Sequence, residues 1–351
     1  MATLNELTIQ VREWAEVGAA KRKAARMARN IGFSGKAIEE ISIVISELAE
    51  NLIAHNTVEG KIICSTIEDH GQKGIQIISL DRGPGITDIG KALQDGFSRK
   101  NSLGIGLGAV KRLMDEFDLS SKTERSGIAL YEDKREGIGT VIMARKWLHR
   151  EEKPEKGLRK TRFAVMSRPK HGETYNGDRA FLHYFEGKTI VALIDGVGHG
   201  KYSEEAAREA DLYLMDNYQK SLERIITEMH MKLRKTRGVV ISIALIDDAH
   251  KTMEYVGIGN ILTRVVKSPV PVSPANYNGI VGATLQSFKC FTHPWSQGNV
   301  IIMTSDGISD KYDLTKYPGL IIKHPVIIAN IILRDYGRAS DDATVIVGGP
   351  A

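Results

Sequence analysis

The sequence predicts an α+β protein of two domains, on three observations. The chain has 351 residues, enough for about two domains of ~150 residues each. A charged stretch near residues 146–162 contains a proline and a glycine and lacks hydrophobic periodicity, which indicates a linker. The pattern before it mixes helices with strands, whereas strands dominate after it. We therefore expect a first domain over residues 1–148, a linker over 149–161 and a second domain over 162–351.

Composition excludes several classes of protein. Hydrophobic residues make up 42% and charged residues 26% of the chain, as in ordinary globular proteins and unlike disordered ones. The longest mostly apolar runs, for example Val239 to Ile246, fall far short of the ~18 residues that a membrane span needs. The first residues show no basic region followed by an apolar core, so we expect no secretory signal. Cys64 and Cys290, the only cysteines, lie far apart, which fits a cytoplasmic protein and excludes a disulfide scaffold or a cysteine-based zinc site.

One basic cluster stands out against a net charge of only +5. It comprises Lys21, Arg22, Lys23, Arg26 and Arg29, and alanines interleave with these residues. A cluster of this kind could contact nucleic acid, but no aromatic or glycine-rich nucleic-acid motif accompanies it. We therefore interpret it as the solvated face of a helix, and we expect neither a nucleic-acid nor a membrane partner.

In the first domain, residues 35–54 have the pattern of one helix that Ser34 can cap. Its apolar residues recur at helical spacing: Ile38, Ile41, Ile45, Leu48 and Leu52. Two strands are expected next, Lys61–Glu68 and Gly74–Leu80, joined by a turn around residues 69–71. A second helix is expected after the glycines at 104–108, running through Val110–Phe117, and residues 138–146 are expected to form the last strand.

In the second domain, apolar runs bounded by turn residues predict strands. These runs are Thr189–Ile194, Val239–Ile246, Met253–Ile258, Val300–Thr304 and Ala343–Val347. Helices are expected between some of them, at residues 203–235 and about 324–336.

The first candidate site begins on the predicted helix 35–54. Glu47 and Asn51 are four residues apart, so they share one face of that helix. A carboxylate there can act as a base or position a water, and an amide oxygen is a hard ligand that suits Mg²⁺. Taken alone, the pair is better explained as a polar stripe on an amphipathic helix.

A second motif, Asp81 to Gly85, directly follows a predicted strand. An Asp at a strand end can accept a hydrogen bond from an exocyclic amine, and neighbouring glycines let a base ring approach the backbone. The alternative for this motif is a simple turn.

A third motif, Gly104 to Gly108, precedes a predicted helix, whose free N–H groups and dipole suit phosphates. It is not a Walker loop, because no Gly-Lys-Ser/Thr follows.

Together, in this order and on these elements, the three motifs resemble the Bergerat-type ATP pocket of the GHKL superfamily, and Thr140 fits a fourth element of that pocket. The closer resemblance is to the small Ser/Thr kinases of bacterial partner switching, namely the anti-sigma-factor kinases and above all the RsbT-like switch kinases. It is carried by Ile45–Asn51, Arg82–Ile86, Asp95–Ser98 and Val110–Phe117, within a match over about residues 5–148.

This resemblance implies an α/β sandwich that binds ATP and Mg²⁺ and transfers the γ-phosphoryl group to Ser or Thr. Glu47 would be the general base and Asn51 the Mg²⁺ ligand. Asp81 would hold adenine, with Thr140 nearby. Five glycines would shape the pocket and its lid: Gly83, Gly85, Gly104, Gly106 and Gly108. Catalysis of this type is mostly positioning and charge neutralisation, which suits a site of few groups.

The second candidate site is a set of aspartates at loops or strand ends. They are Asp178, Asp195, Asp306, Asp341 and Asp342, in four separate motifs. An Asp-Gly pair alone indicates a turn, but four aspartate motifs in order indicate a shared site. Clustered carboxylates repel each other unless a cation lies among them, and hard oxygen ligands suit Mg²⁺ or Mn²⁺. Two such ions can bind a phosphate and activate a bridging water.

These motifs resemble the PPM-type Ser/Thr phosphatases of the SpoIIE branch, and within it the short RsbX-like enzymes, over about residues 160–349. The string Asp195-Gly-x-Gly-His199-Gly200 is the most specific. The resemblance implies an α-β-β-α sandwich with two Mn²⁺ or Mg²⁺ ions, which Asp195 would bridge with help from the Gly196 carbonyl. His199 would either donate a proton or shape its loop. The other expected ligands are Asp178, Asp306, Asp341 and, as a further neighbour, Asp342.

The two resemblances together imply a cytoplasmic, bifunctional regulator of a bacterial partner-switching pathway. The first domain would phosphorylate Ser or Thr on a STAS-domain anti-sigma antagonist or a stressosome-type protein, and the second would remove such phosphates. A downstream phosphatase or sigma regulator is a further expected partner. The alternatives are a first domain that only binds a partner, beside a phosphatase that is the sole enzyme, and a scaffold that is inactive in both halves.

Overall fold

The computed structural model describes residues 2–55, 57, 59–69, 71–94, 106–123, 139–148, 161–267 and 270–350. The described residues divide into two compact units. The first contains the described residues up to 148 together with Leu314–Ile327, and the second contains the remainder. No helix in these described ranges is both long and apolar enough to cross a membrane.

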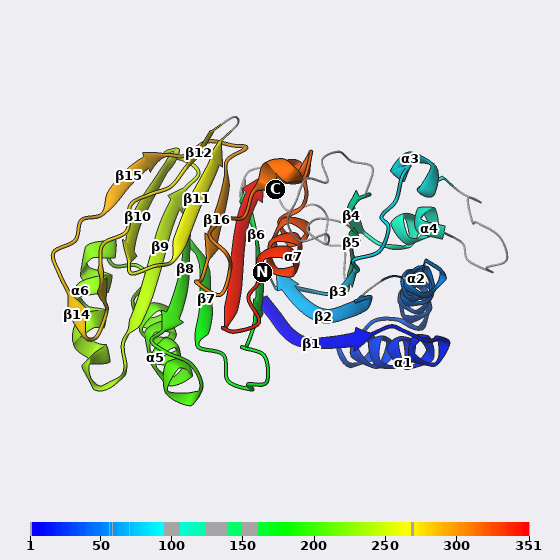
Figure 1. The fold of residues 1–351 in the computed structure, drawn as a ribbon, viewed down its shortest axis with the longest axis horizontal. Coiled ribbons are helices and arrows are strands. Elements are labelled where there is room, and N and C mark those ends of the chain that lie inside the picture. The colour runs from blue at the N-terminus through cyan, green and yellow to red at the C-terminus, as the bar shows by residue number, and fades with distance from the viewer. Residues whose placement is uncertain are drawn as a thin grey trace. The chain divides into compact units, whose positions relative to one another are not determined.

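The first unit is one antiparallel sheet covered by helices (Figure 1). The strand order is β1-β2-β3-β5-β4, with β1 at Ala2–Gln10, β2 at Lys61–Asp69, β3 at Gln72–Leu80, β4 at Glu116–Lys122 and β5 at Gly139–Trp147. The helices are α1 (Trp14–Asn30), α2 (Gly35–Ala54), the short α3 (Ile89–Ala92) and α4 (Gly106–Leu113). One apolar core joins α1, α2 and α4 to the sheet.

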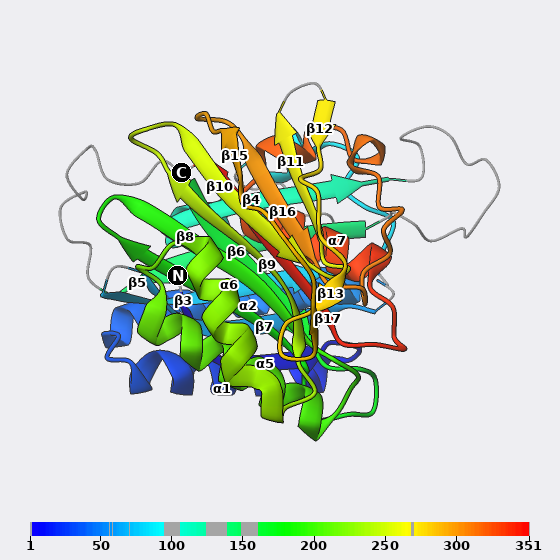
Figure 2. The ribbon, with the colours of Figure 1, turned by 90° about the vertical axis from the view of Figure 1, so that its left-hand side faces the viewer.

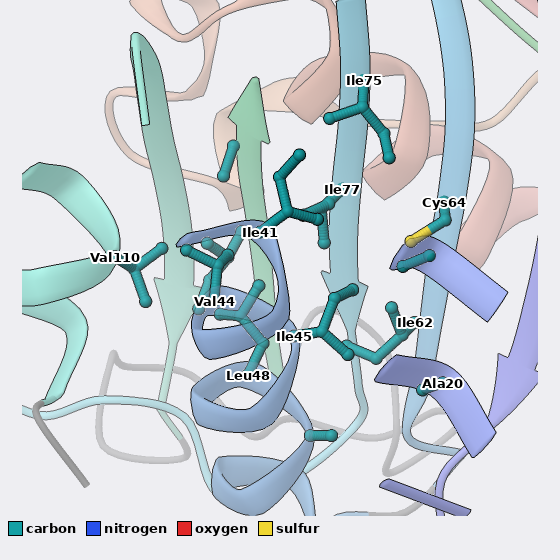
Figure 3. Packing of buried hydrophobic residues seen from close by; sticks show 14 of the residues in the cluster. Ala20, Ile41, Val44, Ile45, Leu48, Ile62, Cys64, Ile75, Ile77 and Val110 are labelled. Carbon is teal, nitrogen blue, oxygen red and sulfur yellow. The ribbon is translucent and has the colours of Figure 1, made fainter. Parts of the chain in front are cut away.

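Helix α2 supplies the centre of that core and confirms the expected helix. The Ser34 side chain caps its start by accepting a hydrogen bond from the Ala37 N–H at 3.4 Å. Figure 3 shows its apolar face, with Ile41, Ile45 and Leu48, against Ile62 and Ile77 of β2 and β3. Burying this stripe fixes which face of α2 remains for polar residues.

Two features of the first unit differ from the sequence expectation. The helix after the glycines ends at Leu113, not Phe117, because residues Glu116–Lys122 form β4 and pair with β5. Strand β1 was not expected either, and it pairs with β2 through Gln10↔Lys61 at its end. In both cases the backbone hydrogen bonds come from a strand distant in sequence, which the local pattern does not reveal. Asp95–Ser98 and Gly104 lie outside the described residues.

The second unit packs two antiparallel five-stranded sheets face to face. One has the order β15-β10-β9-β8-β7, with strands Phe291–Pro294, Thr252–Ile258, Val239–Asp247, Lys188–Gly196 and Asp178–Phe185. The other has the order β12-β11-β16-β17-β6, with strands Val270–Val272, Leu262–Lys267, Val300–Thr304, Ala343–Pro350 and Thr161–Arg168. A small hairpin joins β13 (Gly279–Ile280) to β14 (Thr284–Leu285). The core between the sheets takes apolar residues from both.

Helices lie outside this sandwich, as the α-β-β-α expectation requires. Helices α5 (Lys201–Asn217) and α6 (Leu222–Lys232) cover the first sheet (Figure 2), and α7 (Pro325–Tyr336) accompanies the second (Figure 1). The single helical stretch expected at 203–235 is wrong, because Ser221 caps a new helix and a 3₁₀ turn at Leu233–Lys235 follows it. Strands β6 and β7 were also missed. The five expected strands are confirmed within a few residues at their ends.

Candidate functional site

The first site joins α2 to the start of α4. Glu47 is only 7% exposed, and its Oε2 accepts the backbone N–H of Gly106 at 3.0 Å. Gly106 begins α4 with a φ of +77°, a conformation that glycine adopts without strain. Asn51 lies one turn beyond Glu47 on α2 and is half-buried. The structure therefore brings Glu47 into contact with Gly106, one of the glycines selected from the sequence.

A second group of predicted site residues surrounds Asp81, which directly follows β3. Its carboxylate is 6% exposed, and its Oδ1 accepts the N–H of Gly83 at 2.6 Å and the N–H of Thr140 at 3.3 Å. The Asp81 N–H in turn donates to the Thr140 carbonyl at 3.0 Å. Asp81 thus ties the end of β3 to β5, and two of the predicted pocket residues lie in contact.

Hydrogen bonds of two hydroxyl groups extend this network from Thr140 to Ser121 of β4. The Thr140 and Ser121 hydroxyls lie 2.8 Å apart, and the Ser121 Oγ accepts the N–H of Ile86 at 2.7 Å. Ser121 was missed from sequence because it lies on the unexpected strand β4. Its only signal is a serine pair, Ser120-Ser121, in a stretch to which the sequence analysis assigned no structure.

Close backbone approach explains two of the predicted glycines. At Gly83 an added Cβ would lie 2.8 Å from Thr57 Cγ2 and 2.9 Å from Asp81 Oδ1. Gly85 has a φ of +74°, and an added Cβ would collide with the Lys122 carbonyl. Gly139, which the sequence analysis did not select, combines a φ of +120° with a clash against the Asp81 carbonyl. Glycine at these three positions therefore allows close approaches that any larger residue would prevent. Gly108 is buried within α4.

The second site is built on the pairing of β7 with β8. Asp178 and Asp195 are direct cross-strand partners, a position that holds the two side chains close together. The Ser305 hydroxyl donates to Asp178 Oδ2 at 2.6 Å and accepts the N–H of Thr344 at 2.9 Å. Ser305, next to Asp306, therefore connects Asp178 to the start of β17, which directly follows Asp341 and Asp342. The predicted aspartates thus gather at one end of the sandwich.

Crowding perturbs the ionisation of these carboxylates. Burial first, and repulsion by Asp178, Asp306, Asp341 and Asp342 second, raise the pKa of Asp195 to about 9. Burial also raises the pKa of Asp178 to about 7, against the hydrogen bond from Ser305. The pKa of Asp306 is raised by burial and by Asp341. A divalent cation bound among such partly buried carboxylates would remove their mutual repulsion.

The described residues do not present a closed metal cage. Among them, no group of three or more His, Cys, Asp or Glu side chains has a geometry that could hold a metal ion. Asp342 is 4% exposed, and its two oxygens accept the N–H groups of Lys170 and Gly177, each at 2.8 Å. These bonds hold the loop before β7 against the loop before β17, which favours a positioning role for Asp342.

Gly196 and His199 have partners of their own. The Gly196 carbonyl accepts a hydrogen bond from the Ser203 hydroxyl at 2.9 Å. The His199 side chain is 58% exposed, and its Nδ1 lies 2.8 Å from Glu173 Oε1. Glu173 was missed, because it lies in a loop without a motif. Asn260, which the sequence analysis did not select, donates to Asp306 Oδ2 at 3.0 Å.

Known proteins are similar to parts of the chain. A family model described as "Histidine kinase-like ATPase domain" matches residues 12–131. The chain is 41% identical over 136 residues to the serine/threonine-protein kinase RsbT of Bacillus subtilis (strain 168), covering 39% of this chain and 91% of that protein. It is 27% identical over 143 residues to the phosphoserine phosphatase RsbX of the same organism, covering 40% of this chain and 71% of that protein.

One solved structure is similar over a larger part of the chain. It is described as "The bacterial stressosome: a modular system that has been adapted to control secondary messenger signaling". The TM-score is 0.51 at 26% sequence identity, and the match covers 54% of this chain and 100% of that chain.

Proposed function

The chain belongs to the family of the serine/threonine kinase RsbT, and from that premise we propose that it is a two-enzyme regulator of a bacterial partner-switching pathway. Its first unit phosphorylates Ser or Thr on a STAS-domain protein of the anti-sigma antagonist or stressosome type. Its second unit hydrolyses such phosphates with the help of Mg²⁺ or Mn²⁺. One observation carries the proposal: each unit withdraws acidic side chains from solvent at its predicted site. In the first unit Glu47 and Asp81 are buried, and in the second the cross-strand partners Asp178 and Asp195 are buried and partly buried, respectively.

In the first unit, the residues divide into binding and proton-transfer roles. Asp81 accepts a hydrogen bond from the exocyclic amine of adenine while its Oδ1 stays bound to two backbone N–H groups. Asn51 offers an amide oxygen to Mg²⁺. Glu47 accepts the proton of the attacking hydroxyl. Bound ATP with Mg²⁺ supplies the phosphoryl group and neutralises its charge.

In the second unit, Asp178, Asp195, Asp306 and Asp341 supply oxygens to the metal ions. The bound ions would activate a water for attack on the phosphate. Ser305 and Asp342 hold the loops that carry these carboxylates. Glu173 fixes the ring of His199 through Nδ1, which leaves Nε2 to give a proton to the leaving serine oxygen.

The test uses a candidate STAS-domain protein, labelled ATP and divalent ions. We expect the parent chain to transfer label, Glu47→Ala to lose transfer, and Asp195→Asn to retain label that the parent removes when Mn²⁺ is added. Metal binding gives a second readout, since Mn²⁺ should raise the Tm of the parent more than that of Asp195→Asn. Two results together would refute both activities. They are no transfer of label by the parent chain, and retention of label on the partner that neither Mn²⁺ nor Asp195→Asn changes.

A second candidate function has one observation in its favour. Glu47 Oε2 already accepts the Gly106 N–H, an arrangement that also suits a structural lock in an ATP-dependent binding module. In that case the first unit only holds a partner and the phosphatase is the sole enzyme. Unchanged partner phosphorylation in Glu47→Ala, or none in the parent, together with retained partner binding, would select this alternative.

A further inference from the structure

A strip of exposed cations lies between α6 and β9 in the second unit. It comprises Lys232, Arg234, Lys235 and Arg237, which we call the basic strip, and all four are exposed. Within the described part of the chain, none of the four pairs with a carboxylate. Nearby cations behave differently, since Lys220 and Arg224 contact Glu228 at 2.6 and 2.5 Å. The strip therefore carries uncompensated positive charge.

Hydrogen bonds fix the end of this strip in place. The Thr236 N–H and hydroxyl both donate to the Leu233 carbonyl at 2.8 Å, and the Gly238 N–H donates to Thr236 Oγ1 at 3.0 Å. The Gly238 carbonyl then accepts the N–H of Val197 at 3.1 Å. Val197 belongs to the loop that follows Asp195. The strip is thus attached directly to the loop of the phosphatase site.

Arg237 lies over that loop. A Cβ added at Gly198 would lie 2.9 Å from the Arg237 guanidinium, and the guanidinium stacks over the Tyr202 ring at 5.1 Å. Tyr202 is itself 62% exposed. An exposed arginine stacked on an exposed aromatic ring is a combination that is enriched in protein-binding surfaces. Here it lies against the loop that follows Asp195, where it offers a charge opposite to that of the aspartates.

We propose that the basic strip, with Tyr202, docks an acidic segment next to the phosphoserine of the protein substrate. This inference deepens the proposed phosphatase function and rests on it. Positive charge beside the site attracts a negatively charged flank and raises the rate of productive encounter. Cations near the end of α6 also suit its helix dipole, but that role does not require Arg237 to lie over Gly198. The attachment to the catalytic loop favours a peptide substrate over nucleic acid.

The experiment compares two phosphoserine peptides that differ only in an acidic or a glutamine-rich flank, with the full chain and Mn²⁺. We expect the parent to hydrolyse the acidic peptide with about tenfold higher kcat/KM, and the preference to shrink in 0.5 M salt. The double variant Arg234→Glu/Arg237→Glu should lose the preference. The single variant Arg237→Glu should already lower the preference. Its matched control, Arg208→Glu, makes the same change of two charges at an exposed cation on α5, which pairs with Glu209 at 3.5 Å, and should keep the preference.

The outcomes separate the two levels of the proposal. A parent that hydrolyses neither peptide refutes the phosphatase function itself. A parent that hydrolyses both peptides equally leaves that function intact and overturns the docking surface. If Arg208→Glu also loses the preference, the preference depends on the net charge of the protein. This result would overturn the docking surface too. The docking surface for a peptide is also overturned if the parent shows no peptide preference and a labelled oligonucleotide binds the parent but not the double variant.

Discussion

Asp81 illustrates how a single residue organises the first unit. Its carboxylate accepts two backbone N–H groups that come from different segments of the chain, and charge-assisted bonds of this kind are stronger than neutral ones. The close approach that these bonds require is possible only because glycines stand at the contact points. Gly139 has the tightest surroundings, with a φ of +120° and the Asp81 carbonyl against the position of a Cβ.

We therefore expect Gly139→Ala to destabilise the first unit by more than about 1 kcal/mol, because strain at positive φ adds to a backbone clash. The variant should also weaken nucleotide binding, since the clash displaces Asp81. Denaturant unfolding and calorimetric titration with an ATP analogue measure the two effects. The matched control is Gly71→Ala, which has a φ of +77° but no atom within 4 Å of an added Cβ. Equal losses of stability in both variants would contradict the role of close approach.

At the scale of elements, one carboxylate holds the corner between α5 and α6. Glu228 accepts hydrogen bonds from Tyr213 at 2.8 Å, from Lys220 at 2.6 Å and from Arg224 at 2.5 Å. The bonds from Lys220, Arg224 and Tyr213, in that order, lower the pKa of Glu228 to about 2. This corner replaces the single long helix that the sequence suggested.

The lowered pKa predicts the pH range in which this corner contributes to stability. The ionised form is favoured in the folded protein, so the contribution is present above about pH 4.5 and is lost as the pH falls through about 2. Glu228→Gln should have a lower Tm than the parent at pH 7. This difference in Tm should shrink as the pH falls from about 4.5 to about 2. Thermal unfolding followed by circular dichroism across the range measures this. Glu205→Gln, which removes an exposed partner of Lys201, should show little effect at any pH. A difference that persists undiminished at pH 2 would contradict the assignment.

At the scale of the whole molecule, the proposed function places two opposed activities in one chain. If both acted on one phosphosite under one condition, the result would be net ATP hydrolysis without a change in the partner. We therefore predict that the two units act on different phosphosites or respond to different states of the partner. Phosphosite mapping on a co-purified partner, with Glu47→Ala and Asp195→Asn in turn, measures this. Equal turnover of one site by both units under one condition would refute it.

Much of the fold was predictable because its signals are local. The periodicity of Ile41, Ile45 and Leu48 identified α2, and the cap at Ser34 fixed its start. The five apolar runs of the second unit became strands. Strands β1 and β4 were missed, because each is defined by pairing with a distant strand and neither has a strong local pattern. The break at Ser221 was missed because both α5 and α6 have helical periodicity on either side of a short turn.

The sequence by itself determined which residue types stand at strand ends and glycine turns, and from these residues it predicted two acidic sites with different chemistry. Only the tertiary structure decided that Asp178 faces Asp195 across two strands, that Ser305 and Asp342 hold the loops around them, and that Arg237 lies over Gly198. The physical reason is that side-chain chemistry and local periodicity are properties of short segments. Contacts between residues far apart in the chain depend instead on strand register and on how the sheets and helices pack.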